Sequence, residues 1–226
     1  MNTALDQLAA QLEEWDPLDI LRWADKTYGV GLVLASSFGA EDMVLVDMWI
    51  QVNPHPTIFY LDTGLLFTET YQLIRRVEQH YRVQTIRVAT SLTLEEQAGH
   101  YGEALWSTNP DHCCTLRKVQ PLQQYLADKT AWITGIRRDQ TVQRRHAAVI
   151  AYDARYHLIK INPLVRWNER DVFRYLVRHQ VPYNPLHDCG YPSIGCMPCT
   201  HAIKPGDDPR SGRWAGQEKT ECGLHL

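Results

Sequence analysis

The sequence predicts an α/β fold in which helices cover both faces of a doubly wound, mostly parallel sheet. Two observations support this prediction. Short apolar runs typical of buried strands alternate along the chain with longer segments whose apolar residues have helical spacing. The first two of these strands each end in a short loop of small or polar residues, and a helix follows directly. A chain of 226 residues can form one such domain with a buried core, expected at residues 1–204, followed by a tail at 205–226.

The elements are predicted from apolar periodicity and from the residues that end each run. In chain order they are an acidic amphipathic helix at 4–26, a strand at 31–35, a helix that begins near residue 43, a strand at 57–61, a helix at 68–81, a strand at 85–88, a helix at 113–122, a strand at 131–135 and a helix at 168–180. From residue 181 onward the chain is expected to be loop-like, and residues 205–220 are expected to be mobile unless a ligand or the core holds them.

Composition and charge exclude several classes of protein. A formal net charge of -3 argues against a nonspecific nucleic-acid binder, but it leaves a small anionic ligand open. The first nineteen residues contain acidic side chains and no basic one, which does not fit a signal or transit peptide, so we expect a cytoplasmic protein. No apolar run approaches the roughly 20 residues that a membrane span requires. In the cytoplasm, six cysteines are expected to be reduced thiols or metal ligands.

Three loops follow predicted strands, and in a doubly wound sheet such loops converge on a ligand crevice. Ser36, Ser37, Phe38 and Gly39 form a small-residue loop before a helix, which is either a phosphate or sulfate cradle or a plain capped turn. Leu61, Asp62, Thr63 and Gly64 form either a helix-capping turn or a second wall of the same site. The third loop begins at Gly135 and contains Arg137, Arg138, Arg144 and Arg145, which suit an anion receptor; the alternative is a solvated basic loop.

The spacing of the cysteines indicates a metal centre. Cys113 and Cys114 are adjacent, and Cys196 and Cys199 form a CxxC pair in a loop rich in Gly and Pro. Zinc with four sulfur ligands is the simplest structural alternative. Neighbouring residues of a helix point about 100° apart, so two adjacent cysteines reach one centre more easily when it is extended. The pattern therefore favours an iron–sulfur cluster over zinc, with a redox CxxC or a disulfide as a third interpretation.

Two further residues have side chains suited to chemistry beside this centre. Lys118 follows Cys114 by four residues on a predicted helix, which places a cation on the same helix face; a solvated lysine is the alternative. Cys222 stands near the end of the chain, where a buried structural thiol is not expected. Lys219, His225, Arg210 and Arg213 are cations or titratable groups near it in sequence that can favour its thiolate, which makes it a candidate nucleophile. Cys189 is assigned a structural place.

Five motifs together resemble the assimilatory adenylyl-sulfate reductases, relatives of the phosphoadenylyl-sulfate reductases with an adenine nucleotide α-hydrolase-like fold. They span nearly the whole chain, at residues 37–42, 61–64, 113–119, 133–138 and 221–225. The resemblance implies a 4Fe-4S cluster on Cys113, Cys114, Cys196 and Cys199, with a structural and electrostatic role exerted through Lys118. It also implies that Cys222 attacks the sulfur of adenosine 5′-phosphosulfate, that AMP departs, and that the S-sulfocysteine then yields sulfite.

The same resemblance implies roles for the remaining residues and for a partner. His225 orients or helps to ionise the thiol, and Lys118, Arg210, Arg213 and the Arg137–Arg138 loop supply cations to the substrate. The Ser36–Gly39 loop holds phosphosulfate oxygens, and Leu61–Gly64 faces the nucleoside. The reductant is expected to be a separate protein, thioredoxin or glutaredoxin. A homo-oligomer is compatible with the sequence, which does not determine the oligomeric state.

Three rival hypotheses remain. A phosphoadenylyl-sulfate reductase, or an enzyme that accepts both nucleotides, would share the chemistry of Cys222. An ATP-dependent adenylating or thiolating enzyme of the same fold would carry zinc on the four cysteines. A metal-sensing module without enzymatic activity would leave Cys222 unexplained.

Overall fold

The structure is a computed structural model that describes residues 3–217, 219 and 221–225. The chain forms two compact units. The first comprises Met1–Tyr60, Arg76–Ile86 and Leu126–Tyr183, and the second comprises Leu61–Arg75, Arg87–Tyr125 and Asn184–Leu226.

The first unit is built on a six-stranded sheet with strand order β3-β2-β1-β4-β6-β5. The strands are β1 (Leu32–Ala35), β2 (Ile58–Leu61), β3 (Thr85–Val88), β4 (Ala131–Ile133), β5 (Ile150–Asp153) and β6 (Leu158–Ile161). β1 pairs in parallel with β2 and β4, β4 pairs in parallel with β6, and β5 pairs antiparallel with β6. The predicted doubly wound, mostly parallel sheet is therefore confirmed. The order of the strands reverses between β1 and β4, which is where ligands bind in such sheets.

The apolar side chains of the central strands are buried on both faces of the sheet. Leu32, Val33 and Leu34 of β1 and all three residues of β4 are buried. Continuous apolar strands of this kind are typical of parallel sheets, because helices cover both of their faces. Helix α3 (Ala40–Val52) is buried on most of its circumference for the same reason. The core thus fixes the ends of β1 and β4 and the loops that leave them.

The N-terminal segment differs from the prediction, because two helices replace the single expected one. They are α1 (Thr3–Leu12) and α2 (Pro17–Tyr28), with Asp16 as the N-cap residue of α2 and Pro17 in its first turn. A residue that precedes proline disfavours the helical region, and Asp16 accordingly has an extended backbone. Proline at the first helical position begins a helix instead of continuing one.

The hairpin of β5 and β6 was also missed by the sequence prediction. Its strands are only four residues long, and they show the register Ile150 with Ile161 and Asp153 with Leu158. Two short, partly polar strands do not stand out from a turn-rich segment. The first unit ends with α9 (Glu169–Arg178), in which Asn168 and Asp171 form a capping box close to the predicted helix start.

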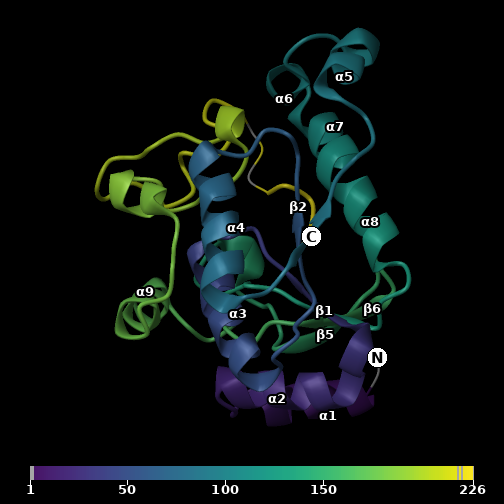
Figure 1. Cartoon of the computed structure of the whole chain (residues 1–226), viewed down its shortest axis with the longest axis vertical. Helices are drawn as coiled ribbons and strands as arrows, with labels where there is room; N and C mark the ends of the chain where they lie inside the picture. Colours follow the sequence, from purple (N-terminus) through teal and green to yellow (C-terminus); the bar gives the residue numbers. More distant parts are fainter. Residues whose placement is uncertain (1–2, 218, 220, 226) are drawn as a thin grey trace. The chain divides into compact units, whose positions relative to one another are not determined.

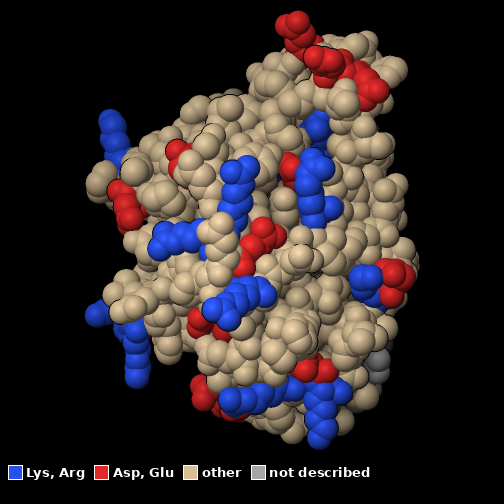
Figure 2. Space-filling model, in the orientation of Figure 1, with Lys and Arg blue, Asp and Glu red and all other residues tan. Residues whose placement is uncertain are grey.

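The second unit carries most of the remaining helices. Helix α4 (Thr68–Tyr81) has the predicted bounds and divides between the two units. The others are α5 (Leu94–Tyr101), α6 (Leu105–Thr108), α7 (Pro110–Cys114) and α8 (Gln120–Leu126), with short 3-10 turns at Pro185–Cys189 and Met197–Cys199. Acidic side chains gather over α5 (Figure 2), where Glu95 and Glu96 lie in the first turn and favour the positive end of the helix dipole. No helix in the described ranges is long and apolar enough to cross a membrane.

Helices α7 and α8 run on as one rod (Figure 1), but the join between them is not α-helical. Thr115–Val119 forms a π-helical segment, and the N–H of Gln120 donates to the carbonyl of Thr115 five residues earlier. Such segments insert one residue into a helix and recur at functional sites. The α-helical spacing expected between Cys114 and Lys118 is therefore corrected to the wider π spacing.

The tail is held against the CxxC segment by backbone hydrogen bonds. The N–H of Trp214 donates to the carbonyl of Cys199 at 3.1 Å, and the N–H of His201 donates to the carbonyl of Gly212 at 2.9 Å. Trp214 is buried. The tail was predicted to be mobile unless a ligand or the core holds it, and this tryptophan anchors it in the core. Positions 218, 220 and 226 of the tail lie outside the described residues.

Candidate active site

In the first unit, the Ser36–Gly39 loop is organised by its own side chains. The N–H and hydroxyl of Ser37 donate to the carboxylate of Asp42 at 2.6 and 2.7 Å, and the N–H of Phe38 donates to Oγ of Ser36 at 3.1 Å. Phe38 has φ 59, an unusual value for a residue with a side chain, and its buried ring packs edge-on against Tyr60. The loop ends at Gly39, the N-cap residue of α3, whose first-turn N–H groups have no intrahelical acceptors.

Asp42 is a residue to which the sequence prediction gave no role. Its carboxylate is buried, and burial raises its pKa to about 6, although the hydrogen bonds from Ser37 oppose that rise. A Cβ on Gly135 would lie 2.4 Å from Oδ1 of Asp42, so only glycine permits this approach. The loops after β1 and β4 are thus brought together, as predicted. The signal in the sequence was an acidic residue three positions after Gly39 on the same turn of the predicted helix.

The arginines after β4 make ion pairs inside the first unit. Arg137 is buried, its Nε donates to Glu41 at 3.0 Å, and its guanidinium also pairs with Asp139. Arg138 donates to Glu13 at 2.9 Å and to the carbonyl of Ala147 at 2.8 Å. A solvated basic loop therefore does not describe Arg137. Contact of either arginine with a bound anion stays a prediction.

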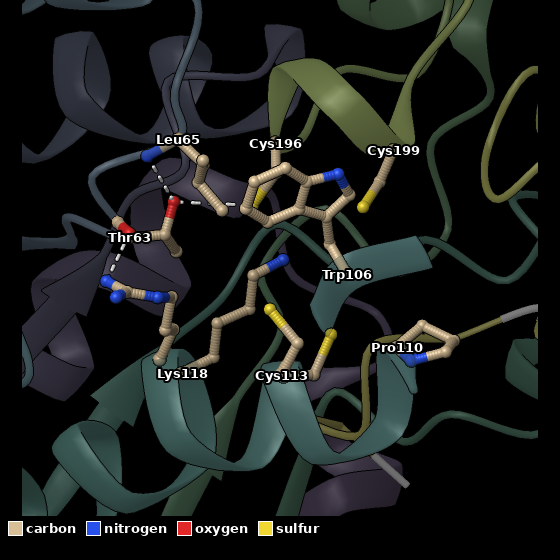
Figure 3. A pocket seen from close by; sticks show the side chains of 10 residues that line it. Thr63, Leu65, Trp106, Pro110, Cys113, Lys118, Cys196 and Cys199 are labelled. Carbon is tan, nitrogen blue, oxygen red and sulfur yellow. Dashed lines mark hydrogen bonds between the residues drawn. The ribbon is translucent and has the colours of Figure 1, made fainter. Parts of the chain in front are cut away.

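In the second unit, the four predicted cysteine ligands line one recess. Figure 3 shows the sulfur of Cys113 pointing toward those of Cys196 and Cys199, with the amine of Lys118 directed into the space between them, and Cys114 lines the same recess. Thr63, Leu65, Trp106, Pro110 and Arg117 complete the walls, and the recess has about 290 Å³ of space, part of it open to solvent. Residues more than 80 positions apart in the sequence thus meet at one place, as the cysteine spacing predicted.

Three of the four thiols are harder to ionise than an ordinary cysteine. Burial and, to a smaller extent, the neighbouring thiolates together raise the pKa of Cys113 and of Cys199 to about 11. Burial also raises the pKa of Cys114. Among the described residues, no group of three or more His, Cys, Asp or Glu side chains has the arrangement of a metal-ion site. The donor set itself, four thiols around one space, fits a metal centre that supplies positive charge.

The Leu61–Gly64 loop belongs to this cysteine recess. The hydroxyl of Thr63 lies 3.3 Å from Sγ of Cys196, and its carbonyl accepts a hydrogen bond from Arg117 at 2.9 Å. Burial raises the pKa of Asp62, but hydrogen bonds from Tyr71, Arg87 and the N–H of Gly64 outweigh burial, so the pKa lies below its usual value. Gly64 has φ 70, a conformation that favours glycine. This loop is therefore more than a capping turn, because it bonds to a predicted metal ligand.

Cys222 has a different electrostatic environment from the four recess cysteines. It is half-buried, and burial raises its pKa, but Lys118, the N–H of Leu224 and Arg213 together outweigh burial and leave the pKa below the ordinary value. Burial lowers the pKa of Lys118, yet the nearby thiolates of Cys196, Cys222 and Cys114 raise it overall, so Lys118 keeps its proton. The structure thus brings the predicted nucleophile and the predicted cation together.

The other predicted residues of the tail occupy distinct positions. Arg213 donates to the hydroxyl of Ser193 at 3.2 Å, and a Cβ on Gly195 would lie 2.2 Å from its guanidinium. Arg210 forms an ion pair with the buried Glu221 at 3.1 Å. His225 is half-buried three residues after Cys222, and its effect on the thiol stays a prediction. Cys189 is exposed at the end of a 3-10 turn, so its expected structural place is not a buried one.

Comparisons with known proteins find relatives that match nearly the whole chain. The family model described as "Phosphoadenosine phosphosulfate reductase domain" matches residues 31–202. Proteins named adenosine 5′-phosphosulfate reductase are 46% identical in Salinibacter ruber, over 99% of this chain and 89% of that protein, and 51% identical in Geobacillus thermodenitrificans, over 92% and 89%. The protein from Bacillus subtilis named adenosine 5′-phosphosulfate reductase 2 is 49% identical over 97% of this chain and 94% of its own length.

Solved structures extend the comparison to the fold. The phosphoadenylyl-sulfate reductase of Candida auris, determined as a phosphate complex, has a TM-score of 0.76 and 32% identity, covering 90% of this chain and 98% of that chain. The FMN adenylyltransferase of Candida glabrata, with a TM-score of 0.60 and 14% identity over 89% of this chain and 71% of its own, shares the fold alone. The chain therefore belongs to the phosphoadenosine phosphosulfate reductase domain family.

Proposed function

We propose that this chain reduces adenosine 5′-phosphosulfate to sulfite and AMP in assimilatory sulfate reduction. The observation that carries the proposal is the placement of Cys222, whose pKa is lowered by Lys118 and Arg213 beside the cysteine recess. A thiolate is the form of cysteine that attacks sulfur, and two fixed cations suit an anionic substrate. The curated relatives that cover nearly the whole chain carry this activity in their names.

The proposed reaction has two steps. The thiolate of Cys222 attacks the sulfonate sulfur, a bond forms between the two sulfur atoms, and the bond from sulfur to the phosphate oxygen breaks. AMP leaves with that bond's electron pair, and an S-sulfocysteine remains. A thiolate of a separate reductant, thioredoxin or glutaredoxin, then attacks Sγ of Cys222, and sulfite leaves with the electron pair of the bond between the two sulfurs. The second thiol of the reductant resolves the mixed disulfide, so the two electrons come from a dithiol.

The residues of the second unit have separate tasks in the first step. Lys118 and Arg213 stabilise the thiolate and the sulfonate oxygens, and Arg210 contributes a cation from the tail. His225 orients the thiol. Through its backbone, the Leu61–Gly64 loop faces the nucleoside.

The first unit is proposed to hold the phosphosulfate oxygens. The N–H groups at the start of α3, after the Ser36–Gly39 loop, suit these oxygens. Glu41 and Asp139 hold Arg137 in place after Gly135, so its guanidinium is preorganised beside the start of α3, and Glu13 holds Arg138.

A 4Fe-4S cluster is proposed on Cys113, Cys114, Cys196 and Cys199. When bound, it supplies charge and rigidity to the recess and no electrons to the substrate. The support is the donor set described above and the hydrogen bond between Thr63 and Cys196. None of the six cysteines, all of which are described, forms a disulfide, which fits a cytoplasmic setting that keeps thiols reduced.

The substrate is the point at which a second candidate function has specific support. The solved relative at 32% identity is a phosphoadenylyl-sulfate reductase, so its 3′-phosphorylated nucleotide is the alternative substrate. The deciding experiment compares sulfite release from the two nucleotides with thioredoxin in excess. Faster turnover of adenosine 5′-phosphosulfate is expected, and faster turnover of the 3′-phosphorylated nucleotide would replace our substrate assignment.

The same assay tests the nucleophile with a matched pair of variants. Cys222→Ser is expected to abolish sulfite release while iron content and nucleotide binding are retained. Cys189→Ser makes the same substitution at an exposed thiol and is expected to retain activity. Full activity of Cys222→Ser would reject the proposed chemistry.

A further inference from the structure

One lysine of the tail connects two anchored parts of the second unit. Lys219 forms an ion pair with Asp111 in the first turn of α7, and its amine lies 5.4 Å from the centre of the Trp214 ring. We propose that Lys219 is a positioning residue: its ion pair with Asp111, which we call the clasp, holds Cys222 at the cysteine recess for attack and opens to present the S-sulfocysteine to the reductant. The inference rests on the proposed function of Cys222.

Asp111 is the fixed end of the clasp. It lies two residues before Cys113 on α7, whose start is set by Pro110 and by the side chain of Asn109, which accepts the N–H of His112 at 3.0 Å. The hydroxyl of Thr115 donates to the carbonyl of Asp111 at 2.9 Å. A carboxylate in the first turn of a helix is also stabilised by the helix dipole. The anchor is therefore part of the rod that carries two recess cysteines.

Lys219 is the movable end of the clasp, and the exposures of the two partners differ sharply. The side chain of Lys219 is 8% exposed and that of Asp111 is 80% exposed. A lysine buried to this degree requires a partner for its charge, and the Trp214 ring and the Asp111 carboxylate provide one. The Asp111 carboxylate is exposed, so water can take the place of Lys219 at this end when the pair opens. The clasp thus combines a defined closed state with one partner that stays solvated.

The clasp lies close enough to Cys222 to control its position. Two residues separate Lys219 from Cys222. Because a trans chain advances at most about 3.6 Å per residue, the Cα of Cys222 lies within about 11 Å of the Cα of Lys219, so fixing Lys219 limits where Cys222 can lie. The ion pair between Arg210 and Glu221 closes the tail onto itself. Among the described residues of the tail, Lys219 makes the ion pair that ties this closed segment to α7.

The clasp acts on the position of Cys222 and not on its ionisation. The cations that lower the pKa of Cys222 are Lys118 and Arg213. Removing the charge of Lys219 is therefore expected to change the accessibility of the thiol and to leave the pH midpoint of its reactivity in place.

The test measures alkylation of Cys222 by iodoacetamide in the full, cluster-loaded chain, relative to the exposed Cys189 in the same sample. Lys219→Gln and Asp111→Asn are each expected to raise this ratio at least threefold, and the double variant is expected to raise it no further than either single one. Lys219→Arg is expected to keep the ratio of the unmodified protein. Lys204→Gln, an exposed lysine of the same tail, is the matched control. Unchanged ratios in both single variants, or additive effects in the double variant, would overturn the clasp.

Single-turnover kinetics separate positioning from general damage. In Lys219→Gln, formation of the S-sulfocysteine is expected to slow and its release by a dithiol to become faster, whereas a structural defect would slow both; slowing of both steps would overturn the proposal. The alkylation ratio requires no substrate. If no S-sulfocysteine forms even in the unmodified protein, the proposed function fails while the ratio still decides whether the clasp exists.

Discussion

Individual side chains set two kinds of thiol apart within one small region. The recess cysteines are buried among one another, which raises the pKa of Cys113 and Cys199 to about 11. Cys222 faces Lys118 and Arg213, which lower its pKa despite burial. We propose that the same residue type serves as metal ligand or as nucleophile according to its neighbours. The sequence predicted this division from the spacing of the cysteines, from the position and neighbours of Cys222 and from a family resemblance, but it did not show the sign of each pKa shift.

Lys118 is expected to control the ionisation of Cys222. In Lys118→Gln the pKa of Cys222 is expected to rise, because a nearby cation is lost, and the thiolate fraction at neutral pH then falls. The measurement is the pH dependence of Cys222 alkylation. Lys129→Gln, at a surface ion pair with Asp128, is the control and should keep the midpoint. An unmoved midpoint in Lys118→Gln would contradict this assignment.

Asp42 is expected to make stability depend on pH. Its pKa is about 6 in the folded state against 3.8 as the reference, so the folded protein holds this proton more tightly and its stability falls as pH rises through that interval. Asn cannot ionise, and Asp42→Asn should therefore gain about 1 kcal/mol relative to the unmodified protein between about pH 5 and pH 7.5. Urea unfolding at the two pH values measures the gain. Asp128→Asn, at an exposed carboxylate, is the control and should show no such gain. No gain in Asp42→Asn would mean that the Asp42 carboxylate is ionised over this whole pH range in the folded protein, which would contradict the prediction.

Secondary-structure elements with strong apolar periodicity were predicted correctly. Features that depend on local backbone geometry, such as a helix break or a π-helical segment, were missed. The bounds of α4 and β3 match the prediction because their apolar patterns are clear and end at polar residues. The division of the first helix required the effect of Pro17 on Asp16 to be recognised. The π segment at Thr115–Val119 has no pattern in residue type that distinguishes it from α-helix. Its presence changes which side of the rod Lys118 occupies relative to the two cysteines.

Helix α7, which carries Cys113 and Cys114, and the turn that carries Cys196 and Cys199 are expected to be equally necessary for the proposed cluster. Substituting any one of Cys113, Cys114, Cys196 or Cys199 by Ser is expected to remove iron and inorganic sulfide, because each supplies a thiolate that serine does not replace. Iron and sulfide analysis after purification without oxygen measures the loss. Cys189→Ser should retain both. A protein that contains zinc and no sulfide would reject the cluster.

At the scale of the whole molecule, the sequence predicted which segments carry chemistry better than how each segment is held. The mostly parallel sheet and the approach of the loops after β1 and β4 followed from the strand-loop-helix pattern, whereas the order of the strands was not predicted. The packing of the tail on the CxxC segment did not, because it depends on one buried tryptophan, Trp214, and on backbone hydrogen bonds between segments with little apolar content. Such contacts depend on the folded chain and leave no periodic signal.

The central claim is that Cys222 takes up the sulfonate group of the substrate, and it can be tested by trapping. The enzyme is mixed with adenosine 5′-phosphosulfate labelled at sulfur, without any reductant, and its peptides are mapped for the label. We predict one label per chain, on the peptide that contains Cys222, together with the release of an equal amount of AMP. The label should be absent from Cys222→Ser. Release of AMP with the label on another residue, or with no label on the protein, would contradict the account.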